Sequence, residues 1–65
     1  MIYSNRMTKQ RLKEIYCENF ERALIREYPL WSGKIHWDAV LHFHYTNVCI
    51  SEAVNKYISS YGEKP

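Results

Sequence analysis

Apolar side chains recur at steps of three and four residues through the first half of the chain, and this spacing restricts the fold more than any other feature. The repeat comprises Leu12, Ile15, Tyr16, Phe20, Ala23, Leu24 and Tyr28. Such steps bring side chains to one face of an α-helix. Thr8 is a suitable N-cap, and Pro29 disfavours helical geometry in the residue before it. The spacing therefore predicts a helix over residues 8–28.

A second region, residues 35–61, carries two further apolar stripes. One stripe contains Trp37, Val40, Leu41, His44 and Val48, and the other contains Ile50, Val54, Tyr57, Ile58 and Tyr61. The step from 48 to 50 turns by about 200° around a helix, so the stripes do not share a face. Thr46 is β-branched and Asn47 is a weak helix former, which favours a break and predicts helices over 35–46 and 50–61. A single long helix stays open as the alternative.

Turn-forming and capping residues lie between these helices and at their ends. Pro29 and the Ser32-Gly33 pair predict a turn between the first two. Leu30 and Trp31 inside it are too apolar for a solvated loop, so we expect them to fold back onto the helices or onto another chain. Ser51 is expected to cap the last helix at its start, and Gly62 at its end.

A β-strand over residues 40–50 was weighed against the helix. The segment is rich in strand-forming residues, but no other part of the chain offers a strand with matching alternation to pair its backbone. The expected fold is all-α, with two to three helices in a single small domain over residues 1–65. Residues 1–7 are expected to be a flexible lead-in, and either Met1 or Met7 can be the start.

Size and composition favour association. The chain has 65 residues, of which 15% are aromatic, and a chain this short buries only about 60% of its unfolded surface. Cys17 and Cys49 lack zinc-site spacing. The first 16 residues contain no apolar run of signal-peptide length, and no run of membrane-spanning length is found in the sequence. We expect a cytoplasmic protein without membrane contact, with both thiols free and filling the core. The surplus of apolar positions predicts a symmetric homodimer.

The side chains capable of chemistry do not form a recognisable site. On a helix His42 and His44 point about 200° apart and cannot hold one ion together. Asp38 and His42 share a face, but two ligands are too few for a metal. No nucleophile motif or glycine-rich phosphate loop is present. We expect no enzyme activity, no cofactor and no metal site.

Two binding functions compete. The basic segment Arg6, Lys9, Arg11 and Lys13 could contact phosphates in a nucleoid-type DNA-binding protein, but the net charge is only +2 and acidic residues follow. The aromatic stretch over 27–45 instead predicts protein contact, because tryptophan and tyrosine bury large areas at low entropy cost. The expected contact residues are Leu30, Trp31, Trp37, Val40, Leu41 and His44.

The chain resembles the AraC-negative-regulator (ANR) family in the segment FERALIREYPLWSGKIHWDAVLHF, which follows a basic amphipathic helix start. The resemblance covers residues 8–61 and is carried by Ala23, by Leu30-Trp31 and by the helix start at Trp37. Members of this family are small proteins of pathogenic Gram-negative bacteria that bind AraC/XylS-type virulence activators and block them. The resemblance implies a mostly helical, cytosolic, self-associating transcription repressor that needs no cofactor.

Overall fold

A computed structural model describes residues 8–65 as three α-helices and a short 3-10 segment, with no strand among these residues. The elements are α1 (Lys9–Glu27), η1 (Pro29–Trp31), α2 (Trp37–Tyr45) and α3 (Ile50–Tyr61). The predicted all-α fold is confirmed, and the helix bounds differ from 8–28, 35–46 and 50–61 by at most two residues. The lead-in over 1–7 and Arg6 lie outside the described residues.

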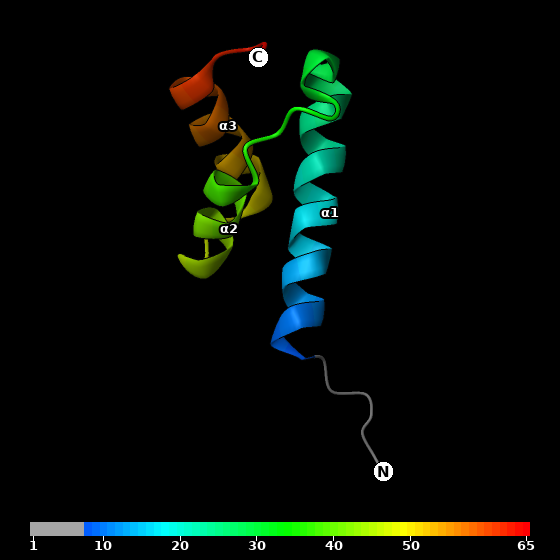
Figure 1. The fold of residues 1–65 in the computed structure, drawn as a ribbon. Coiled ribbons are helices and arrows are strands. Elements are labelled where there is room, and N and C mark those ends of the chain that lie inside the picture. The colour runs from blue at the N-terminus through cyan, green and yellow to red at the C-terminus, as the bar shows by residue number, and fades with distance from the viewer. Residues whose placement is uncertain (1–7) are drawn as a thin grey trace.

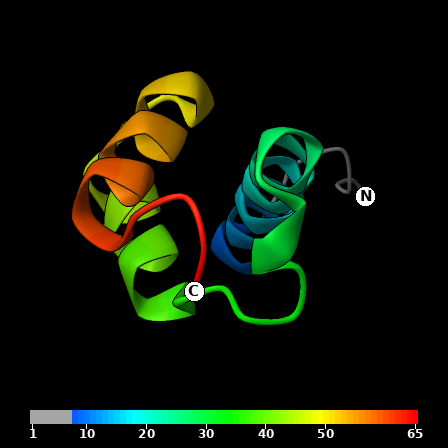
Figure 2. The same cartoon turned by 90° about the horizontal axis from the view of Figure 1, so that it is seen from above.

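The helices form two layers, with α1 in one layer and the antiparallel pair of α2 and α3 in the other (Figure 1, Figure 2). Helix α1 packs against both partners. The core between the layers contains Phe20, Leu24, Trp31, Ile35, Val40, Ala53, Val54 and Tyr57. Within residues 8–65 no buried side-chain nitrogen or oxygen lacks a hydrogen-bond partner. The apolar faces predicted from the spacing therefore meet in one core.

The helix ends follow the predicted signals, with one exception. The Oγ1 atom of Thr8 accepts a hydrogen bond from the backbone N–H of Arg11 at 3.0 Å, which confirms this N-cap. Gly62, at φ 92°, ends α3 and donates its N–H to the carbonyl of Ile58 at 2.7 Å. The Ser51 cap was wrong, because the N-cap position belongs to Cys49 and Ser51 lies inside α3.

The break between α2 and α3 lies where the two apolar stripes change phase. Asn47 adopts φ 61°, a left-handed conformation that asparagine tolerates better than most residues because its short side chain can hydrogen-bond locally. The N–H of Val48 donates to the carbonyl of Phe43 at 3.0 Å and closes the turn. The alternative of one long helix over 35–61 was therefore wrong.

A hydrogen bond determines where the α2–α3 pair lies along the length of α1. The Tyr16 hydroxyl donates to the carbonyl of Val48 at 2.6 Å, so the α2–α3 turn lies beside Tyr16. Helix α1 begins at Lys9 and has 19 residues, whereas α2 has nine. The start of α1 therefore extends past the other helices, as Figure 1 shows. This overhang positions the candidate site.

Candidate protein-binding surface

A row of apolar side chains on α2 stays on the surface. Trp37 is 40% exposed and Tyr45 is 66% exposed, and Leu41 between them is partly buried. Residues spaced by four are neighbours along a helix face, so we call these three residues the α2 strip. Val40 on the same helix is fully buried. Helix α2 carries apolar side chains on more than one face, and only one of these faces is buried against α1 and α3. The α2 strip is the apolar part that stays accessible to solvent.

The α2 strip leads into a hollow beside the overhanging start of α1. The hollow has a volume of about 340 Å³ and is lined by Lys9, Gln10, Leu12, Lys13, His44 and Tyr45. We call it the α1–α2 hollow. Tyr45 belongs to both features, and Leu12, which is 46% exposed, faces the same hollow from α1. The strip and the hollow therefore form one continuous apolar surface.

The rim of the hollow is positively charged. Lys9 and Lys13 are one turn apart on α1, and no carboxylate lies among the lining residues. The ion pairs among residues 8–65 join Arg11 with Glu14 at 3.6 Å and Lys56 with Glu52 at 3.7 Å, and neither involves the two rim lysines. The basic segment predicted from the sequence is thus divided, because Arg11 is paired within α1 and the lysines face the hollow.

His44 forms part of the wall of the hollow. Its ring lies 5.2 Å from that of Tyr16 and 5.4 Å from that of Tyr45, measured between centroids. The side chain is partly buried. His42, two residues earlier, is exposed.

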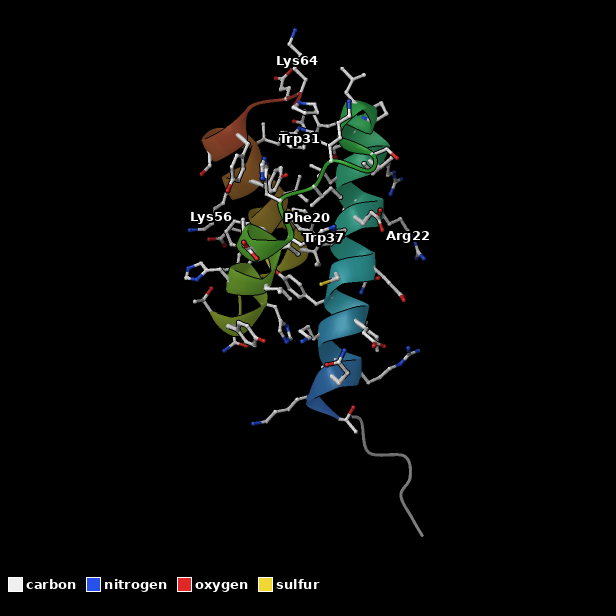
Figure 3. All side chains as sticks on the ribbon, in the orientation of Figure 1. Phe20, Arg22, Trp31, Trp37, Lys56 and Lys64 are labelled. Carbon is white, nitrogen blue, oxygen red and sulfur yellow. The ribbon has the colours of Figure 1, made fainter. Side chains whose placement is uncertain are left out.

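The structure separates the six predicted contact residues into three groups. Trp37 is exposed, and Leu41 and His44, one and two turns further along α2, are partly buried, so all three keep accessible surface. Trp31 and Val40 are 1% and 0% exposed, so their side chains fill the core and the prediction that they contact a partner is corrected. Figure 3 shows Trp31 between α1 and the end of α3, well above Trp37. The two indoles therefore do not leave the turn together.

Leu30 belongs to the third group. It is 63% exposed and lies at the far end of α1, where it lines a shallow surface with Glu27, Tyr28, Pro29, Glu63 and Lys64. A helix of 19 residues is about 28 Å long, so Leu30 and the α1–α2 hollow are at opposite ends of the molecule. They cannot contact the same small segment of a partner.

Sequence reasoning missed Leu12 and Tyr45 as surface residues. Leu12 was assigned to the core face of the first helix, and Tyr45 was not singled out. A signal for both was present in the lengths of the predicted helices. The first helix is longer than either of the next two, so one of its ends has to extend beyond them and leave its last apolar side chains uncovered.

The two cysteines are free and have different surroundings. Cys17 packs against the core, and its burial raises the pKa of the thiol, with Lys13 acting in the opposite direction. Cys49 is exposed, so the expectation that it fills the core was wrong. The nearby backbone N–H of Glu52, and after it the Ser51 hydroxyl, lower the pKa of the Cys49 thiol.

Within residues 8–65, no three His, Cys, Asp or Glu side chains lie close enough together to hold a metal ion. No helix in that part of the chain is sufficiently long and apolar to span a bilayer. Among known proteins, no family model, no curated protein and no solved structure matches the chain.

Proposed function

We propose that the chain is a negative regulator that binds an AraC/XylS-type transcription activator in the cytoplasm and blocks it by protein–protein contact. The observation that carries this proposal is the exposure of Trp37 and Tyr45 on a helix whose other face completes the core. Exposed tryptophan and tyrosine grouped on one surface are typical of protein interfaces. The resemblance to the ANR family supplies the class of the partner.

The shape of the surface favours a macromolecular partner over a small molecule. Small-molecule sites bury most of the ligand in a concave cavity. The α2 strip lies along the accessible face of a helix, and the α1–α2 hollow beside it is lined by the start of α1 and the end of α2. A partner that touches both must reach over a helix and into the hollow, which a protein segment can do.

Repression of a reporter gene tests the proposal. The chain is expressed with each AraC/XylS-type activator of its own genome and a reporter driven by that activator, and at least one reporter is expected to fall. Trp37→Ala should restore expression, because truncating a hot-spot tryptophan costs about 2 kcal/mol or more of binding, roughly a thirtyfold loss. Arg22→Ala is the control, since Arg22 points away from α2 and α3 (Figure 3), and it should repress normally.

Two outcomes would count against this function. In the first, no activator of the class is repressed. In the second, Trp37→Ala and Tyr45→Ala variants with normal circular dichroism spectra repress as well as the parent chain. Binding of the purified activator to the purified chain, measured by anisotropy, shows whether repression comes from direct contact.

DNA binding is the alternative, and the orientation of Lys9 and Lys13 toward one hollow is the observation that favours it. Phosphate contacts weaken steeply with salt, whereas burial of apolar side chains does not. A gel-shift titration across salt concentrations therefore separates the two functions. Repression that persists without an activator, together with a steep salt dependence of duplex binding, would favour the alternative.

Self-association as a homodimer is part of the proposal. Leu30, with 63% of its side chain exposed beside Pro29, offers an apolar contact at the end of the molecule away from the hollow. Light scattering at high micromolar concentration should report twice the mass of the chain, and Leu30→Glu should reduce it. A monomer at that concentration would contradict the dimer without affecting the activator-binding proposal.

A further inference from the structure

We infer that the α1–α2 hollow receives a short amphipathic helix of the partner whose apolar residues are flanked by acidic side chains. This inference rests on the proposed function and specifies which kind of segment is recognised. It is carried by the charge of the rim, by the apolar lining and by the helical walls of the hollow.

The charges of the rim select an acidic partner. No carboxylate is among the residues that line the hollow with Lys9 and Lys13, and neither lysine takes part in an ion pair among residues 8–65. Gln10, the other polar residue of α1 in the lining, donates its amide to Glu14 at 3.1 Å. Aspartate or glutamate beside the apolar anchors would pair with the lysines, whereas lysine or arginine there would be repelled.

The apolar lining and the small volume of the hollow favour a partner that inserts only a few apolar side chains. Leu12 and Tyr45 face the hollow from α1 and α2, and the His44 ring closes its wall. The volume of about 340 Å³ is at the lower end of the range of roughly 300–1,000 Å³ that ligand sites occupy. The hollow can therefore accommodate a few side chains of a partner but not a larger part of a folded domain.

The walls favour a helix as the bound segment. Both walls are helices, whose backbone groups are paired internally, and residues 8–65 contain no strand edge to which a β-strand could add. A helix docks by apolar anchors at steps of three and four. The α2 strip from Trp37 to Tyr45 is about 12 Å long, so a partner helix of two to three turns covers the strip and ends in the hollow.

A second copy of the chain is a poor occupant of the same hollow. A symmetric contact through it would bring Lys9 and Lys13 of one protomer against the same lysines of its partner, and like charges at a contact are costly. Self-association is therefore expected to use another surface, such as the one around Leu30.

Two labelled helical peptides test the inference. They share leucines at positions i, i+3, i+4 and i+7, and they carry flanking glutamates in one peptide and flanking lysines in the other. In fluorescence anisotropy titrations of the full chain, the glutamate peptide should bind at least about tenfold more tightly. Lys9→Glu combined with Lys13→Glu should reverse this order. Lys34→Glu combined with Arg22→Glu changes the net charge equally outside the hollow and should preserve it.

Leu12→Ser tests the apolar contribution separately from the charges, and it should weaken the binding of both peptides. Lys13 is partly buried and the other substituted residues are exposed. None of them belongs to the core, so circular dichroism should show parental helicity. The inference is overturned if the parent chain binds both peptides equally or if the rim variant keeps the parental preference. It is also overturned if Leu12→Ser dissociates a self-associated chain, or if duplex DNA outcompetes the glutamate peptide.

Reporter repression distinguishes this inference from the proposed function. If the parent chain and the Lys9→Glu/Lys13→Glu variant repress equally, the inference fails and the proposed function stands. If no activator is repressed but the peptide preference is observed and reversed as expected, the function fails and the ligand class of the hollow stands.

Discussion

The indole of Trp31 donates its Nε1–H to the carbonyl of Gly62 at 3.1 Å, which joins the connection after α1 to the end of α3. The same ring packs edge-on against Tyr57, with centroids 4.9 Å apart. The Tyr57 hydroxyl accepts the backbone N–H of His36 at 2.8 Å, so it holds the residue that precedes α2. Trp31 and Tyr57 therefore connect segments that lie far apart in the sequence.

Replacing Trp31 with alanine should lower the free energy of unfolding by about 3–5 kcal/mol, because it empties the largest site in the core. A domain this small has only about 5–15 kcal/mol in total. Trp37→Ala is the matched control, since it removes the same side chain from a surface position, and it should cost about 1 kcal/mol. Urea unfolding followed by far-UV circular dichroism measures both. Equal losses would contradict the assignment of Trp31 to the core and Trp37 to the surface.

Asn47 should respond to substitution according to its backbone conformation. At φ 61° a β-branched residue is strained, so Asn47→Val should lower stability by about 1–2 kcal/mol. Asn47→Gly should be tolerated, because glycine adopts positive φ without a steric penalty. Thermal unfolding of the two variants provides the comparison. A valine variant as stable as the glycine variant would indicate that α2 and α3 are not separated by this turn.

The two thiols should react with iodoacetamide at different rates near neutral pH. Cys49 is exposed and its pKa is lowered by the N–H of Glu52 and the Ser51 hydroxyl, so more of it is thiolate. Cys17 is partly buried and its pKa is raised by burial. Mass spectrometry of timed samples should show Cys49 alkylated first. Faster labelling of Cys17, or a Cys17–Cys49 bridge in unreduced material, would contradict the structure.

Alkaline pH should destabilise the fold. Burial raises the pKa of the Tyr16 and Tyr57 hydroxyls above the ordinary value of 10.0, and the nearby Cys49 and Cys17 thiolates add to the effect at Tyr16. Above that pH the unfolded chain loses these protons before the folded chain does, so stability present at lower pH is lost as pH rises through the folded-state values. Urea unfolding on both sides of pH 10 measures the slope. Stability that stays constant or rises there would contradict the burial of these groups.

The helices were predictable because their signals are local. The spacing of apolar residues from Leu12 to Tyr28, the Thr8 cap and the Gly62 terminator act within one or two turns of the chain. The break at Asn47 was also visible, as a change of phase between two stripes. Each of these signals depends on backbone geometry and on neighbours fewer than five residues away, so it can be read without knowing the fold.

The candidate site was only partly predictable. Sequence reasoning selected Trp37, Leu41 and His44, which lie on the accessible side of α2, but it placed Trp31 with them. Trp31 lies in the connection before Ser32-Gly33 and Trp37 follows it, and nothing in these local positions shows which indole is buried. What buries Trp31 is contact with Tyr57 and Gly62, residues more than 25 positions away. Whether a side chain is buried therefore depends on which elements, distant in the sequence, pack against it in the fold.

The α1–α2 hollow is likewise a product of tertiary structure. The sequence by itself determined an all-α fold of two to three helices of unequal length and the apolar stripes on them. Only the packing decided where the shorter helices lie along the longer one, through contacts such as the hydrogen bond from Tyr16 to Val48. That position leaves Leu12 and Lys13 uncovered and brings Tyr45 beside them. Helix formation depends on local spacing and caps, whereas the position of one helix along another depends on long-range packing that no local pattern encodes.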